Sequence, residues 1–189
     1  PEPLNALEII KVGTGYGLDN QLPDEVEHMM PDYSLYPELT KDTAYGFLTR
    51  GCPRGCHFCI VSEKEGRRSR KVADLSEWLG GQKYIKLLDP NLLACKEHME
   101  LLGQLGDSGA MVDFTQGLDC RLLNKENITA INQIRLKDIH FAWDYMRETD
   151  AVLKGLRLYS AKASRKVHGA YGTVYCLTGY DTTMEENLH

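Results

Sequence analysis

The sequence predicts an α/β protein organised around a parallel β-sheet. Short runs rich in β-branched and aromatic residues alternate with longer stretches whose apolar residues follow helical spacing. The runs recur at intervals of roughly 30 to 40 residues, which is typical of β-α-β units. Strands joined through helices in this way are parallel, and either a partial barrel or an open sheet fits the pattern.

Five runs are predicted to be strands, and four stretches between them are predicted to be helices. The strand runs are TAYGFLT (43–49), KYIKLL (83–88), AMVDFTQ (110–116), KDIHFAW (137–143) and GTVYCLT (172–178). The helical stretches are ADLSEWL (73–79), ACKEHMELLGQL (94–105), KENITAINQI (125–134) and ETDAVLKGLRLYSA (148–161). Asn124 is a suitable N-cap for the third helix, because its short polar side chain can accept a hydrogen bond from a first-turn amide.

The first 42 residues have a different character, because Pro23, Pro31 and Pro37 interrupt any regular element. We predict that residues 1–42 are the tail of a preceding domain with a linker, and that residues 43–189 form the α/β core. The chain begins at Pro1, and its last helix-like segment is short. We therefore expect a fragment of a longer protein, with a core that is incomplete at its C-terminus.

Composition narrows the class of protein. Hydrophobic residues make up 42% and charged residues 26% of the 189 positions, the balance of a globular domain. The net charge of −5 gives no overall basic field, so nucleic-acid binding is not indicated. No apolar run approaches the roughly 20 residues of a membrane helix, so no membrane association is predicted. Six cysteines without a secretion signal predict reduced thiols in the cytoplasm.

Three of the cysteines form a compact motif, TRGCPRGCHFCIV, directly after the first predicted strand. Cys52, Cys56 and Cys59 have the spacing C-x₃-C-x₂-C, and glycine and proline between them let the backbone wrap around a small object. Thiolates are the ligands of zinc and of iron–sulfur clusters. A structural zinc site needs four ligands, whereas three thiolates on a [4Fe–4S] cluster leave one iron open. The spacing favours the cluster.

Zinc remains an alternative. His57 is adjacent to Cys56 and would be poorly placed to complete a tetrahedron, but Cys95, Cys120 or Cys176 could reach the motif in the fold. A non-catalytic metal-binding module, holding zinc or an iron–sulfur cluster for a structural or interaction role, is therefore the competing functional hypothesis.

The cysteine motif, with Phe58 before its last cysteine, resembles the radical S-adenosylmethionine superfamily, and the similarity extends from about Tyr45 to Glu186. This resemblance implies a partial (β/α)₆ TIM-like barrel, here truncated after the fifth strand. It also implies that Cys52, Cys56 and Cys59 bind three irons, while the fourth iron chelates S-adenosylmethionine. Such enzymes take an electron from a donor such as flavodoxin or ferredoxin and cleave the cofactor to a 5′-deoxyadenosyl radical, which abstracts hydrogen from a substrate.

Polar residues and one glycine follow the other predicted strands, and barrel enzymes place their catalytic and binding residues at these strand ends. The candidate cofactor-binding residues are Phe58, Asp89, Gln116, Asp119, Arg121, Asp144 and Gly179. Asp89 is expected to accept a hydrogen bond from the cofactor's ammonium group, and Arg121 to bind its carboxylate. Each has a structural alternative: an Asp-Pro turn for Asp89, and an Asp119–Arg121 ion pair.

These strand-end segments resemble those of uncharacterised bacterial and phage-type members related to the methylthiotransferase and cobalamin-dependent branches. Asp144 is a candidate for a ribose or substrate contact, and Gly179 for backing the adenine. The N-terminal segment resembles the linker after a cobalamin-binding-like domain, so cobalamin is a possible further cofactor. The other cysteines form no second triad, which argues against an auxiliary cluster. The basic run EGRRSRK (65–71) fits either an anionic substrate or a solvated charged face.

Overall fold

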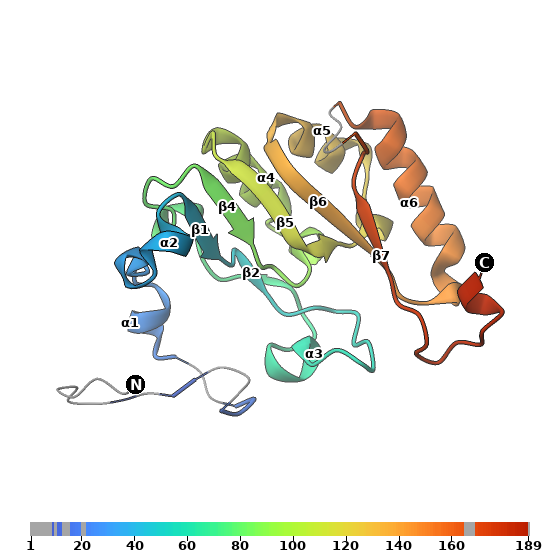
Figure 1. Cartoon of the computed structure of the whole chain (residues 1–189), viewed down its shortest axis with the longest axis horizontal. Coiled ribbons are helices and arrows are strands. Elements are labelled where there is room, and N and C mark those ends of the chain that lie inside the picture. Colours follow the sequence, from blue (N-terminus) through green and yellow to red (C-terminus); the bar gives the residue numbers. More distant parts are fainter. Residues whose placement is uncertain (1–8, 10, 13–15, 20–21, 165–168, 189) are drawn as a thin grey trace.

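The computed structural model describes residues 9, 11–12, 16–19, 22–164 and 169–188. A five-stranded sheet in the order β1-β4-β5-β6-β7 runs through the described part of the chain (Figure 1). The strands are β1 (Thr43–Gly46), β4 (Tyr84–Leu87), β5 (Met111–Leu118), β6 (Arg135–Trp143) and β7 (Thr173–Cys176). Every neighbouring pair is parallel. The prediction of an α/β protein with a parallel sheet is confirmed.

Three longer helices connect the later strands. They are α4 (His98–Asp107), α5 (Lys125–Gln133) and α6 (Thr149–Lys162). α4 packs on α5 and α5 packs on α6, so the helices follow the strand order in one layer (Figure 1). At the start of α5, Asn124 and Asn127 each accept a hydrogen bond from the other's backbone amide, which confirms the predicted N-cap.

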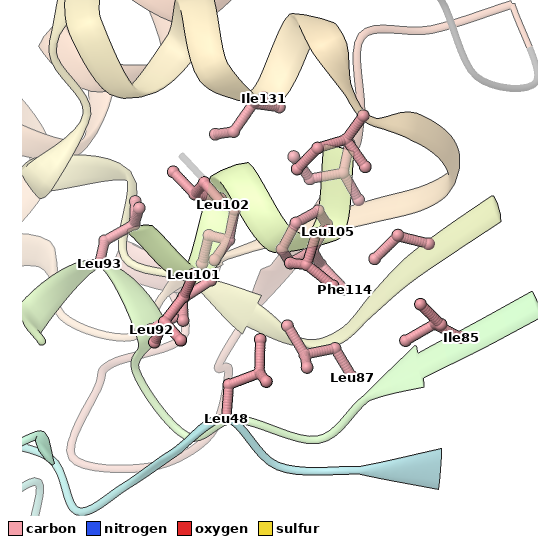
Figure 2. Close-up of a cluster of buried hydrophobic side chains, with 14 of the residues drawn as sticks. Leu48, Ile85, Leu87, Leu92, Leu93, Leu101, Leu102, Leu105, Phe114 and Ile131 are labelled. Atoms are coloured by element: carbon pink, nitrogen blue, oxygen red, sulfur yellow. The ribbon is translucent and has the colours of Figure 1, made fainter. Parts of the chain in front are cut away.

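The core lies between this helical layer and the sheet. Alternate strand residues such as Ile85 and Leu87 are buried, because successive side chains of a strand point to opposite faces. Figure 2 shows the cluster around them: Leu48, Ile85, Leu87, Leu92, Leu93, Leu101, Leu102, Leu105, Phe114 and Ile131. Burying each such side chain contributes about 1.5–3 kcal/mol. The cluster therefore fixes the strands, and with them the loops that leave their ends.

Two sequence predictions fail at element boundaries. The run 43–49 is not one strand: β1 ends at Gly46, and β2 (Thr49–Arg50) leaves the sheet to pair antiparallel with β3 (Arg70–Lys71). The stretch 73–79 is not a full helix but the short η2 (Leu75–Glu77). Its capping box, formed by Asp74 and Glu77, closes a single turn.

The remaining elements are short. They are α1 (Asp24–Glu27), η1 (Tyr33–Leu35), α2 (Pro37–Thr40), α3 (Val61–Lys64), η3 (Leu92–Ala94), η4 (Cys120–Leu122), η5 (Met146–Glu148) and η6 (Glu186–Leu188). The N-terminal tail predicted for 1–42 falls partly outside the described residues, but Tyr33 Oη donates to the Trp78 carbonyl at 2.7 Å and ties η1 to the core. Within the described ranges, no helix has the length and apolarity to cross a membrane.

Candidate functional site

A cleft of about 640 Å³ opens where the parallel strands end. All five strands or the loops after them contribute to its wall, together with the cysteine loop that follows β2. The lining residues used below are Cys52, Arg54, Cys56, Phe58, Cys59, Asn91, Gln116, Asp119, Arg121 and Asp144. The structure thus gathers eight of the ten predicted site residues in one cavity, although they span more than ninety positions of the sequence.

The cysteine loop has the backbone conformation that its glycines permit. Gly51 and Gly55 have φ angles of 85° and 59°, in the left-handed region that favours glycine. A Cβ on Gly51 would collide with the carbonyl of Arg68. The loop is fastened at its start, because Cys52 N donates to Gly66 O at 3.1 Å and Gly51 N donates to Glu65 Oε2 at 2.9 Å. Part of the run 65–71 therefore holds the cysteine loop in place.

The three thiols are half-buried and have no disulfide partners. Burial, and then the nearby charge of Asp144, raises the pKa of Cys56. Because a thiolate is the form that binds metal, an incoming metal must displace this proton. Phe58 packs against the rings of Tyr145 and Tyr180, at centroid distances of 6.0 and 5.3 Å. These aromatic contacts join the cysteine loop to the segments after β6 and β7.

The other cysteines do not join the motif. Cys95 and Cys120 lie in the hydrophobic core, and burial raises the pKa of Cys120 to about 11. Cys176 is exposed on β7, and His57 is exposed and is not among the residues that line the cleft. In the described part of the chain, no three His, Cys, Asp or Glu side chains lie close enough together to hold one metal ion.

Asp119 is a buried carboxylate of the cleft wall that binds two arginines. Arg54 Nε donates to its Oδ2 and Arg121 Nε to its Oδ1, both at 2.7 Å. Burial would raise the pKa of Asp119, but the hydrogen bonds from Arg121 and Arg54 outweigh it and lower this pKa. Arg121 also pairs with Glu148. The predicted Asp119–Arg121 pair is therefore present, and the fork expected to bind a carboxylate is already engaged by two acids.

Asp89 does not line the cleft, although its neighbours Leu88 and Pro90 do. It is 6% exposed, and its carboxylate accepts hydrogen bonds from Leu48 N at 2.8 Å, Thr49 N at 2.7 Å and Thr49 Oγ1 at 2.5 Å. Burial raises the pKa of Asp89 to about 6. These bonds tie the end of β4 to the chain just before the cysteine loop. The geometry thus gives Asp89 an anchoring role and offers no support for the predicted contact with a cofactor ammonium group.

Of the last three predicted residues, two line the cleft and one does not. Gln116 and Asp144 line the cleft, and burial raises the pKa of Asp144. Gly179 does not line it, although its φ of 73° uses the freedom of glycine. One basic residue of the run 65–71 has two acidic partners: Lys71 Nζ lies 2.7 Å from carboxylate oxygens of Asp74 and Glu100. For Lys71, this supports the solvated-face interpretation of the run.

Sequence reasoning missed several residues of the wall, and two of them, Arg54 and Asn91, make polar contacts there. Arg54 stands between Cys52 and Cys56, and its position inside the motif was the available signal. Asn91 follows Asp89 by two positions and is 4% exposed; the D-x-N form of the segment LLDPNLL was the available signal, but only its Asp was predicted to belong to the site. Both make contacts between loops that are distant in sequence, Arg54 with Asp119 and Asn91 with Cys52.

No protein-family model matches this sequence, and a search of curated proteins finds no match. The functional interpretation therefore depends on the geometry of the cleft and on the cysteine motif.

Proposed function

We propose that this chain is the core of a radical S-adenosylmethionine enzyme with a [4Fe–4S] cluster on Cys52, Cys56 and Cys59. The observation that carries the proposal is the position of the motif: three closely spaced thiols open into a cleft at the carboxyl ends of five parallel strands. Cofactor enzymes built from β-α repeats place their chemistry at this end of the sheet.

The donor set fits a cluster better than a single ion. Zinc needs four ligands in a tetrahedron, and the candidates for a fourth ligand, His57, Cys95, Cys120 and Cys176, do not line the cleft with the three motif cysteines. In a cubane each thiolate binds a different iron, so the three sulfurs surround a volume and do not meet at one atom. The three cysteines on one glycine-rich loop, half-buried at the cleft, suit that arrangement.

The sheet topology supports the finer proposal of a partial barrel. Strands in sequential order, with the connecting helices in one layer, are the arrangement of (β/α) barrels. A doubly wound sheet would change direction at a switch point and carry helices on both faces. We therefore retain a partial TIM-like barrel as the proposed fold family.

The cleft suits S-adenosylmethionine in size and lining. Its volume of about 640 Å³ lies within the range of ligand pockets, roughly 300–1,000 Å³. Phe58, Gln116 and Asp144 offer apolar, amide and carboxylate contacts. Cys52, Cys56 and Cys59 would hold the cluster, which, after reduction by a donor such as flavodoxin or ferredoxin, would supply the electron for cleavage of the cofactor's sulfonium. The chain's own part is to orient the cofactor and substrate and to exclude water.

Anaerobic purification and a product assay test the proposal. The wild-type chain should bind about four irons with matching sulfide and, when reduced, convert S-adenosylmethionine to methionine and 5′-deoxyadenosine. Cys56→Ala should lose both properties, whereas the matched variant Cys120→Ala, in the core, should keep its iron. A colourless wild-type protein that binds zinc and leaves the cofactor intact would contradict the proposal and favour a non-catalytic metal-binding module.

A further inference from the structure

A buried amide lies against the sulfur of the first cysteine. Asn91 Nδ2 is 3.5 Å from Cys52 Sγ and 3.4 Å from Asp119 Oδ2, and the residue is 4% exposed. A side-chain NH₂ group has two hydrogens, so it can donate to the sulfur and to the carboxylate at once. The Asn91 amide thus connects the cysteine loop, the loop after β4 and the end of β5.

The electrostatics of Asp119 determine which way this amide faces. The two bonded arginines keep Asp119 ionised, as its lowered pKa indicates. An ionised carboxylate only accepts hydrogen bonds. The nitrogen of Asn91, and not its oxygen, must therefore face Asp119, and the same nitrogen then faces Cys52 Sγ. The oxygen and nitrogen of an asparagine side chain are otherwise hard to tell apart, and here the carboxylate of Asp119 decides which is which.

The backbone of Asn91 is also held. Ser69 Oγ donates to the Asn91 carbonyl at 2.9 Å. The next two residues, Leu92 and Leu93, are buried in the hydrophobic core. Because the Asn91 carbonyl and the two residues after it are fixed, little conformational entropy is lost when the amide donates to the sulfur. The contact is therefore built into the fold.

We propose that Asn91 is a positioning residue that donates a hydrogen bond to the Cys52 sulfur and raises the reduction potential of the cluster bound there. This inference depends on the proposed function, because it requires a cluster on Cys52. Reduction adds negative charge to the cluster and its thiolate ligands, so a donor stabilises the reduced form more than the oxidised form. Hydrogen bonds to the sulfurs are among the factors that set iron–sulfur potentials.

Redox titration followed by electron paramagnetic resonance tests the inference without any turnover. In Asn91→Leu, a variant of similar shape without a donor, the ratio of reduced to oxidised cluster at a fixed potential should fall about three- to tenfold. The tenfold limit corresponds to a shift of about 59 mV to more negative potential for one electron. The matched variant Asn132→Leu, on α5, should titrate like the wild type. An unchanged potential in Asn91→Leu would overturn the inference.

A second measurement needs no variant, in case Asn91→Leu assembles no cluster. Asn91 is the one asparagine among the described residues that line the cleft. Wild-type protein carrying ¹⁵N in asparagine side-chain amides should show a ¹⁵N hyperfine coupling to the reduced cluster, and its absence would also overturn the inference. A wild-type chain that binds no cluster would instead refute the proposed function itself, so the two failures can be told apart.

Discussion

Asp119→Asn should destabilise the protein strongly, because this carboxylate binds two arginines. The Asp119 side chain is 4% exposed, against 31% for Arg54 and 15% for Arg121. Asparagine has nearly the same shape, so the substitution leaves no cavity. What changes is charge and acceptor count: one amide oxygen remains for two guanidinium donors, and an NH₂ group faces the other donor.

The magnitude follows from those contacts. A hydrogen bond to a charged group contributes about 1.5–3 kcal/mol, and one of the two is lost outright. The other becomes a bond to a neutral acceptor and weakens by roughly 0.5–1 kcal/mol. The sum is a loss of about 2–4 kcal/mol in the free energy of unfolding. For a chain of this length that corresponds to a decrease of about 4–16 °C in Tm.

Urea unfolding and thermal melting of the full chain, both followed by circular dichroism, measure this loss. The matched control is Asp107→Asn, an exposed residue at the end of α4, which should change the unfolding free energy by less than about 0.5 kcal/mol. Equal stabilities of Asp119→Asn and Asp107→Asn would refute the view that Asp119 organises the cleft wall through its arginines.

Three further predictions concern the thiols and one helix contact. Because the pKa of Cys56 is raised, its thiol stays protonated to a higher pH than an ordinary cysteine, so iron bound per chain after reconstitution should still be increasing at and above about pH 8.5, the ordinary pKa of a thiol; a profile that is flat in this range would contradict this. Cys95→Ala should retain iron while Cys52→Ala loses it, and an iron-free Cys95→Ala would make Cys95 a ligand. Gly155→Ala places a Cβ against the Cys120 carbonyl and should lower stability by about 1–3 kcal/mol. Gly103→Ala, in open space on α4, should be neutral or stabilising by up to about 1 kcal/mol; matching melting temperatures for the two would argue against that helix contact.

The sequence predicted the sheet well because its strands fall in runs rich in β-branched and aromatic residues that are separated by helical stretches. β4 and β7 lie within the predicted runs 83–88 and 172–178, and α5 matches its predicted helix 125–134 to within one residue. Periodicity reports on such local features. It did not detect that the chain leaves the sheet after Gly46, because the antiparallel partner of β2 lies about twenty residues away.

Much of the candidate site was also visible in the sequence, because strand ends of a parallel sheet meet at one edge. What sequence alone could not assign was the partner of each polar group. Asp89 and Asp119 both follow strands, yet one is directed at backbone amides and the other at two arginines. That difference arises from the paths of the loops, which sequence patterns do not specify.

The electron paramagnetic resonance spectrum of anaerobically reconstituted, reduced protein, with and without S-adenosylmethionine, tests the central claim most directly. The account predicts a [4Fe–4S]⁺ signal whose shape changes when the cofactor is added, because Cys52, Cys56 and Cys59 leave one iron open to bind it. A cluster signal that is indifferent to the cofactor, or zinc in place of iron, would contradict the account.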